Sequence, residues 1–137
     1  MLSFALSSPE VVRLRAVQSH DDAESHVDWR VTYSDERFTF KGHMMIPVIG
    51  ALHAGGPNGW ADVHVAALIA VLNNEPSDLD AELAGSDAIE TLYDIARGHM
   101  MPLLTAVSAT QVLPQKSPQA EVSAFEPDSD NAEVGEQ

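Results

Sequence analysis

Alternating apolar and polar residues mark four segments of the chain as candidate strands. In "HVDWRVTY" (residues 26–33), apolar side chains occupy every second position and Asp28, Arg30 and Thr32 stand between them. This period of two is the pattern of a half-buried strand. The segment "PEVVRLRAVQSH" (9–20) alternates in the same way, with Val12, Leu14 and Ala16 on one face.

The other two candidate strands are "FTFKGHMMIPV" (38–48) and "WADVHVAALIAVLN" (60–73). The polar tetrad 34–37 joins segment 26–33 to segment 38–48, which predicts a hairpin. In segment 60–73 both faces become apolar after His64, so we expect its second half to be covered on both sides. The short connections between the four segments predict an antiparallel meander.

Beyond the last candidate strand the period changes to that of a helix. The segment "SDLDAELAG" (77–85) offers Ser77 as N-cap and Gly85 as a stop, which predicts one short helix. Asp87 and Glu90 then form a box-like start for a longer helix. Its apolar stripe consists of Ile89, Leu92, Tyr93, Ala96, Met100, Leu103, Leu104 and Val107. Pro102 lacks the N–H that the carbonyl of residue 98 needs, so we expect a bend or an end there, with Gly98 leaving room for the bend.

The order of these patterns predicts an α+β fold, in which one long C-terminal helix packs on a four-stranded antiparallel sheet. We assign residues 1–114 to a single domain. From Pro114 on, three prolines, six acidic residues and a single aromatic predict an acidic, extended or disordered tail over residues 115–137. Within that tail, "AEVSAF" is the stretch that could dock transiently.

The chain carries a formal charge of −14, of which residues 1–114 contribute −9 and residues 115–137 contribute −5. Both parts repel a phosphate backbone, so we expect no nucleic-acid partner. No run approaches the roughly 18 apolar residues of a membrane span, so we expect no membrane insertion. The chain has no cysteine, and its start, "MLSFALSS", has no basic residue ahead of the apolar patch. Both features fit a cytoplasmic location.

The candidate chemical motifs are weak. Six histidines invite a metal site, most of all His53 and His64 with Asp62 nearby, but no pair has the i, i+4 spacing of a zinc protease. We favour histidines on polar faces or in loops. The segment "AGGPNG" (54–59) lacks the Lys-Ser/Thr of a phosphate loop, and no serine lies in a G-x-S-x-G context. We therefore expect no enzyme, no metal and no cofactor.

Two long stretches without charge are the most informative part of the sequence. They are residues 42–61 and 98–115, and each contains a His-Met-Met triplet. Both can be ordinary core, but methionine also suits surfaces that accept many partner shapes. One sheet and one helix leave no obvious cover for a helix end that is uncharged all round. We therefore interpret these stretches as a candidate interface with a second subunit, a bound polypeptide, or both.

Sheet first, long helix second and surplus apolar surface together resemble the SecB-type export chaperones, including their shorter actinobacterial SecB-like relatives. The most specific residues are those of "LYDIAR" (92–97), which look like the family's leucine-aromatic-x-x-alanine-arginine signature. "WADVHVAALIAV" looks like its last core strand, residues 80–84 occupy the place of its strand-to-helix connection, and "QVLPQKSP" is similar to the segment after its helix. The resemblance spans about residues 10–118.

The sequence departs from the family pattern at three helix positions. Asp94 and Ile95 stand where proline and tyrosine are frequent, and Gly98 stands in place of glutamate. The zinc-binding tail through which typical members contact the SecA motor is missing, because the chain has no cysteine.

The resemblance implies ATP-independent holding of unfolded polypeptides, in a homo-oligomer that is usually a dimer of dimers, with a role in protein export through a SecA-type motor as one option. It carries over Leu92, Tyr93, Ala96 and Arg97 as helix and interface positions, and the stripe adds Ile89. From the uncharged stretches we predict a client-binding groove formed by Phe40, Met44, Ile46, Trp60, Met100, Met101 and Leu104.

Two alternatives stay open. The chain can be an oligomeric adaptor or structural subunit with one fixed partner, or a SecB-like chaperone dedicated to the antitoxin of a toxin–antitoxin pair. Several unrelated unfolded clients would favour the general chaperone, whereas one tight stoichiometric partner would favour the alternatives.

Overall fold

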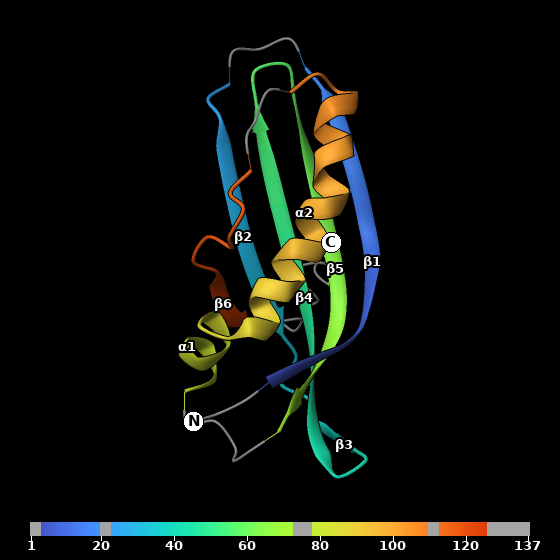
Figure 1. The fold of residues 1–137 in the computed structure, drawn as a ribbon, viewed down its shortest axis with the longest axis vertical. Helices are drawn as coiled ribbons and strands as arrows, with labels where there is room; N and C mark the ends of the chain where they lie inside the picture. The colour runs from blue at the N-terminus through green and yellow to red at the C-terminus, as the bar shows by residue number, and fades with distance from the viewer. Residues whose placement is uncertain (1–3, 20–22, 73–77, 110–112, 126–137) are drawn as a thin grey trace, which may run out of the picture.

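The structure, a computed structural model, describes residues 4–19, 23–72, 78–109 and 113–125. It contains a six-stranded sheet with a long helix lying along it (Figure 1). The strands are β1 (Phe4–Gln18), β2 (His26–Tyr33), β3 (Phe38–Phe40), β4 (His43–Gly56), β5 (Gly59–Val71) and β6 (Glu121–Ala124), and the helices are α1 (Leu79–Ala84) and α2 (Asp87–Ala106). The predicted α+β class is confirmed, but the sheet is larger than the four strands expected.

The strands follow the order β1-β5-β4-β2-β6, and β3 pairs with β4 off this path. The predicted meander is right for β2, β4 and β5, which pair antiparallel in sequence order. It is wrong for β1, which pairs with β5 instead of β2, from Phe4↔Val71 to Gln18↔Gly59. Because β5 is apolar on both faces in its second half, it is a central strand, and β1 supplies the neighbour at its other edge.

Two tight turns set the register of the central hairpins. Lys41 and Gly42 both have positive φ, 51° and 82°, and divide the predicted segment 38–48 into β3 and β4. Pro57 and Asn58, the latter with φ 82°, form the two-residue connection between β4 and β5. The predicted loop "AGGPNG" is therefore a hairpin turn flanked by strand residues.

The core lies between α2 and one face of the sheet. The helix buries Leu92, Tyr93, Ala96 and Met100 completely, and it packs mainly against β1, β4 and β5. Trp29 of β2 packs edge-on against Tyr93, with ring centroids 5.5 Å apart. Gly50 of β4 makes this contact possible, because a Cβ there would lie 2.5 Å from Trp29 Cη2 and 2.8 Å from Leu92 Cδ2. The helix therefore lies unusually close to the sheet at Gly50.

The helix ends differ in detail from the prediction. Ser86 is the N-cap of α2, where its hydroxyl accepts the Ile89 N–H. Asp78 caps α1, while the predicted cap, Ser77, lies outside the described residues. The helix continues past Pro102 to Ala106. The predicted role of Gly98 in leaving room is not needed, since a Cβ there would meet nothing within 4 Å.

A segment after α2 returns across the helix and ends as a sixth strand. Leu113 and Ala120 are buried, and the Tyr93 hydroxyl donates to the Pro114 carbonyl at 2.7 Å. β6 then pairs parallel to β2 over four residues. Within residues 115–137, which the sequence predicts to be an extended or disordered tail, residues 121–124 form β6, and the burial of their side chains alternates. Residues 126–137 lie outside the described part.

Candidate functional site

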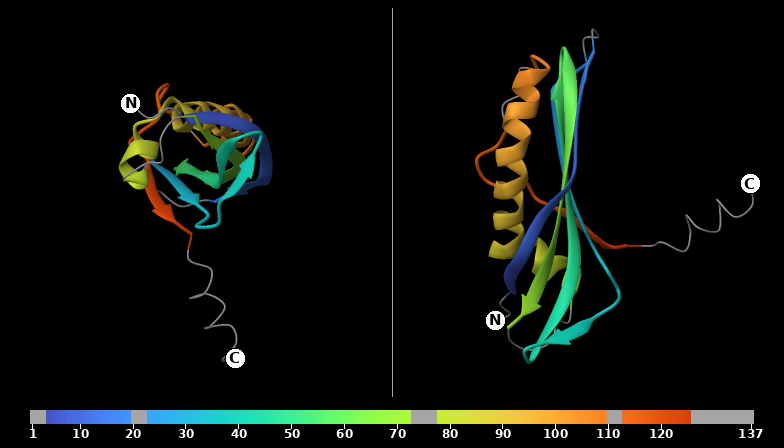
Figure 2. Two further views of the ribbon diagram at one scale, coloured as in Figure 1. Left: turned by 90° about the horizontal axis from the view of Figure 1, so that it is seen from below. Right: turned by 90° about the vertical axis from the view of Figure 1, so that its right-hand side faces the viewer.

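The two faces of the sheet differ in their cover. Figure 2 (right) shows α2 along one face, whereas no described helix covers the other. We call this second face the open face. Side chains alternate along β4 and β5, so that the residues between the core positions point to it. The open face is therefore accessible to a binding partner.

Residues that are opposite one another across the strands form rows on the open face. Two rows near one end are polar, and they contain Arg15–Asp62–His53–Asp28 and Arg13–His64–Ala51–Arg30–Glu121. The next two rows are mainly apolar at their centres, and they contain Glu10–Ala66–Ile49–Thr32 and Ser7–Leu68–Pro47. The open face therefore changes from charged to apolar along the strands.

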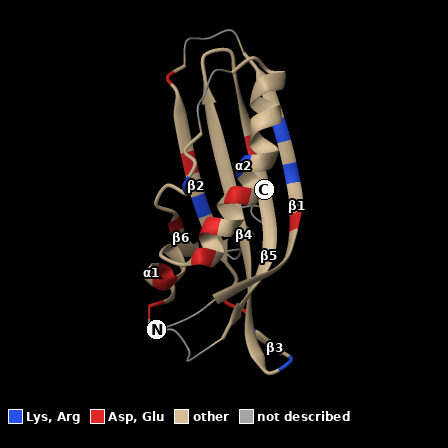
Figure 3. Ribbon diagram, viewed as in Figure 1, with Lys and Arg blue, Asp and Glu red and all other residues tan. Residues whose placement is uncertain are grey.

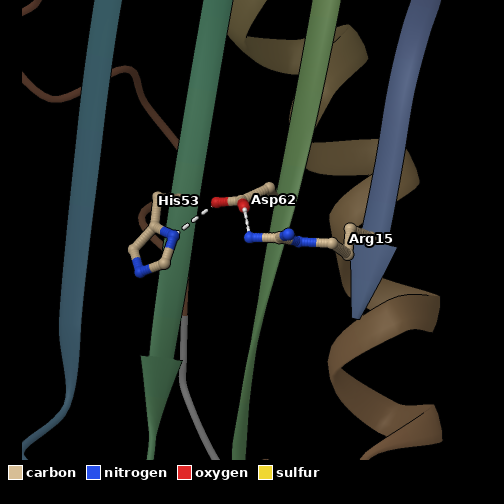
Figure 4. Close-up of polar contacts among 3 residues, drawn as sticks. All are labelled: Arg15, His53 and Asp62. Carbon is tan, nitrogen blue, oxygen red and sulfur yellow. Dashed lines mark hydrogen bonds and ion pairs between the residues drawn. The ribbon is translucent and has the colours of Figure 1, made fainter. Parts of the chain in front are cut away.

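The polar end is organised around Asp62 (Figure 4). One carboxylate oxygen contacts His53 Nδ1, and the other lies 3.5 Å from Arg15 Nη2. The Arg15 guanidinium also stacks on the Trp60 ring, 4.7 Å from its centroid. The His53 ring stacks on His26 with centroids 5.0 Å apart. Opposite charges that face each other on neighbouring strands stabilise a sheet, so this cluster fits a structural role.

Among the described residues, the side chains around Asp62 do not form a metal site. No group of three or more His, Asp or Glu side chains there is arranged to hold an ion.

Two side chains on the strands have shifted pKa values, His64 of β5 and Tyr33 of β2. Burial, assisted by Arg13, lowers the pKa of His64 below its ordinary value. The hydrogen bond from the Tyr33 hydroxyl to Asp80 raises the pKa of Tyr33 to about 12, since it stabilises the neutral phenol.

The apolar end of the open face is hollowed into a groove of about 450 Å³. Its floor consists of Pro47, Ile49, Ala66 and Leu68 from β4 and β5. Its rim is formed by Ser8 and Glu10 on one side and by Thr32, Tyr33, Ser34 and Phe125 on the other. We call this feature the open-face groove. Its apolar floor and polar rim suit an extended polypeptide that carries apolar side chains.

Charge is distributed unevenly around the sheet (Figure 3). Acidic residues gather on α1 and on the first half of α2, whereas β1 carries Arg13 and Arg15 beside Glu10. The floor of the open-face groove carries no charged side chain. A polypeptide in the groove would therefore contact apolar side chains on the floor and the charge of Glu10 at the rim.

The predicted client-binding residues lie in different environments. Ile46 of β4 and Met100 and Leu104 of α2 are buried between the helix and the sheet, so a client could reach them only if the helix moved. Phe40 and Met101 are exposed, the first on β3 and the second on the outer side of α2. Met44 and Trp60 are half-buried, and Trp60 belongs to the polar cluster. The structure does not bring these seven residues together into one groove.

The predicted interface residues pack largely within the chain itself. Ile89, Leu92, Tyr93 and Ala96 are buried against the sheet, which accounts for their apolar character without a second subunit. Arg97 is half-buried, and its Nε atom has no hydrogen-bond partner among the described residues.

Sequence reasoning missed Pro47, Ile49 and Phe125 as surface residues, although one signal pointed to the groove. The second half of segment 60–73 is apolar on both faces, and we expected it to be covered on both sides. Within one chain it is covered by α2 on one face only, so Leu68 lines the open-face groove. The apolar pattern indicates that both faces of this strand need cover. It does not indicate whether the chain itself or a partner supplies that cover.

Comparison with known proteins identifies the fold. The SecB-like chaperone Rv1957 of Mycobacterium tuberculosis, solved in complex with a ChAD peptide from the Rv1956 HigA1 antitoxin, matches with a TM-score of 0.57 and 14% sequence identity. The match covers 85% of this chain and 88% of that one. The chain has a SecB-like fold. No protein-family model matches the sequence, and no curated protein matches it either.

The SecB-like fold puts the other observations in context. The six-stranded sheet and the long helix on one of its faces are the features of this chain that the fold comparison covers. Neither helix in the described ranges combines the length and the apolar character that crossing a bilayer requires.

Proposed function

We propose that this chain is a chaperone that holds unfolded polypeptides in the open-face groove without using nucleotide. The observation that carries the proposal is the uncovered apolar floor of Pro47, Ile49, Ala66 and Leu68 on a SecB-like fold. Contiguous apolar surface marks an interaction site, and the net charge of −14 opposes non-specific aggregation through that surface.

The groove suits a holding function because its contacts are short-ranged and not selective. A client side chain that is fully buried on such a floor contributes about 1.5–3 kcal/mol before entropy losses. Two or three such contacts give weak, reversible binding, which lets a client leave and fold.

A second candidate is service to a single client. The SecB-like chaperone of M. tuberculosis was solved with a peptide from an antitoxin. By analogy, this chain would hold the unfolded segment of one antitoxin and keep it from degradation. An export role through a SecA-type motor, or a fixed structural partner, is a further option with no contact in the fold that favours it.

Assembly is part of the proposal. The homo-oligomer, a dimer of dimers in the form first expected, would need surfaces other than the buried stripe of α2. The free edge of β1, with exposed Val12 and Leu14, and the outer side of α2 around Met101 supply apolar area for it. Light scattering on the purified chain would report its mass.

The decisive experiment is an aggregation-suppression assay without nucleotide. Three unrelated proteins diluted from urea are mixed with the chain at stoichiometric amounts, and turbidity is followed. We expect suppression of all three. Suppression of none, together with tight stoichiometric binding of one antitoxin peptide, would favour the dedicated chaperone, and the absence of both would refute the proposal.

A further inference from the structure

We infer that β6 occupies the edge of β2 as a displaceable internal strand, and that an extended client segment takes its place when the chain binds a polypeptide. The inference rests on the proposed function and identifies the partner of the β2 edge. That partner is an extended segment with apolar side chains at alternate positions followed by an aromatic residue, the pattern that β6 itself presents.

The pairing of β6 shows what the β2 edge accepts. Four residues pair parallel to β2, from Arg30↔Glu121 to Tyr33↔Ala124, and the backbone N–H of Phe125 donates to the Tyr33 carbonyl at 2.7 Å. Val122 packs half-buried against the core while Ser123 is exposed. Backbone bonds of this kind add a strand to a sheet edge without reading its sequence.

The groove and the β2 edge form one continuous site. Thr32 and Tyr33 end β2 and Ser34 follows them, and all three line the groove. Phe125 lines it from the β6 side. Phe125 is 49% exposed, so an aromatic ring already lies at the rim with part of its surface in solvent. A client that fills the groove and bonds to the edge therefore meets β6 and Phe125 in its way.

The attachment of β6 is weak where the strand begins and firm just before it. The Arg30–Glu121 ion pair, at 3.3 Å, joins side chains that are 66% and 77% exposed, and such pairs contribute little. By contrast, Ala120 is buried and the Ser117 N–H is bound by Glu90 at 2.8 Å. The segment up to Ala120 can thus stay docked while the four-residue strand opens, as short terminal elements do.

The first test locks the strand in place. Arg30→Cys with Glu121→Cys joins two directly opposite residues that do not line the groove, in a chain that has no other cysteine. The probe is reduced and carboxymethylated ribonuclease A, which stays unfolded and has no free thiol that could open the disulfide, and binding is measured by fluorescence anisotropy. We expect the oxidised protein to bind at least about tenfold more weakly than the same protein after reduction. Equal binding by both forms would mean that clients add outside β6, and would overturn the inference.

The second test loosens the strand and does not depend on the chaperone function. The probe is a labelled synthetic peptide with the sequence of residues 119–125. Val122→Asp places a charge on the side of β6 that packs against the core, and Ser123→Asp places it on the exposed side as the matched control. We expect Val122→Asp to bind the peptide about tenfold more tightly than Ser123→Asp does, because the edge is vacant more often.

The outcomes separate the two proposals. Peptide binding that is equal in the two variants overturns the displaceable strand. Peptide binding that follows the expected order, combined with no capture of ribonuclease A by any form, retains the displaceable strand and refutes the chaperone function. Urea unfolding of each variant verifies that the remainder of the fold is intact.

Discussion

The carboxylate of Glu90, in the first turn of α2, accepts a hydrogen bond from the backbone N–H of Ser117 at 2.8 Å. The bond joins the helix to the segment that leads to β6. The sequence suggested Glu90 as part of a capping box at the helix start. In the structure Ser86 caps the helix, and the Glu90 carboxylate binds Ser117 instead. This hydrogen bond therefore ties the start of the helix to the returning segment that leads to the sheet edge.

Glu90→Ala should lower the free energy of unfolding by about 1–2 kcal/mol, the value of a partly buried hydrogen bond to a charged acceptor. Asp94→Ala is the matched control, because Asp94 is an exposed acid on the same helix. Urea denaturation measures both. Equal stabilities of the two variants would show that the Ser117 contact contributes nothing.

Gly50→Ala should destabilise the chain by about 1–3 kcal/mol, because the new methyl group overlaps Trp29 and Leu92. Gly98→Ala is the opposite case. Its Cβ meets open space within a helix, so the substitution should stabilise the chain by about 0.5–1 kcal/mol. Thermal unfolding of both variants checks the pair. A destabilising effect at residue 98 would mean that the helix needs glycine there for another reason.

His64 should make the fold less stable as the pH falls. Its pKa in the folded chain lies below the ordinary value of 6.5, since burial disfavours the charged ring and Arg13 repels it, while Asp62 opposes the shift. The unfolded chain therefore takes up the proton first. The His64 contribution is present above about pH 6.5 and is lost as the pH drops through the folded pKa. His64→Gln should flatten the decline measured between pH 7 and 5.5, and His43→Gln, at an exposed position, should not.

Ile49→Asp with Leu68→Asp should weaken client capture about a hundredfold, because two floor contacts of about 1.5 kcal/mol each are lost. Ile49 is 40% exposed, so the cost to folding should be small. Anisotropy with unfolded ribonuclease A measures capture.

Met44→Asp with Met101→Asp charges the surface first predicted from the sequence, on residues that do not line the groove. We expect a smaller loss of capture than for the floor variant. A loss as large or larger would move the client-binding surface to the helix side of the sheet.

Local periodicity predicted the elements whose residues repeat with a clear period. The alternating segment 26–33 has the same bounds as β2. The stripe from Ile89 to Leu104 marks the buried side of α2. The partner of β1 was not predictable in this way, because pairing depends on which distant strand has a free edge. The sequence indicated β6 only as part of a stretch, "AEVSAF", that could dock transiently, since four residues carry too little pattern to separate a strand from a tail.

The site was the least predictable part for the same reason. Uncharged residues such as Met100 and Leu104 indicate burial, and burial under the chain's own helix looks identical in sequence to burial under a partner. Ile49 and Leu68 share a face, but only the position of α2 shows that this face is the open one. The sequence therefore indicated an excess of apolar area but not which face of the sheet carries it.

The pairing of Phe4 with Val71 has a consequence for synthesis on the ribosome. The first strand to emerge is the outermost strand of the core sheet, and it has no partner until β5 has left the exit tunnel. During that interval β1 must wait as an unpaired extended segment, and contacts this distant in sequence form slowly. A nascent copy of this chain is thus itself an unfolded polypeptide of the kind that the finished fold is proposed to hold.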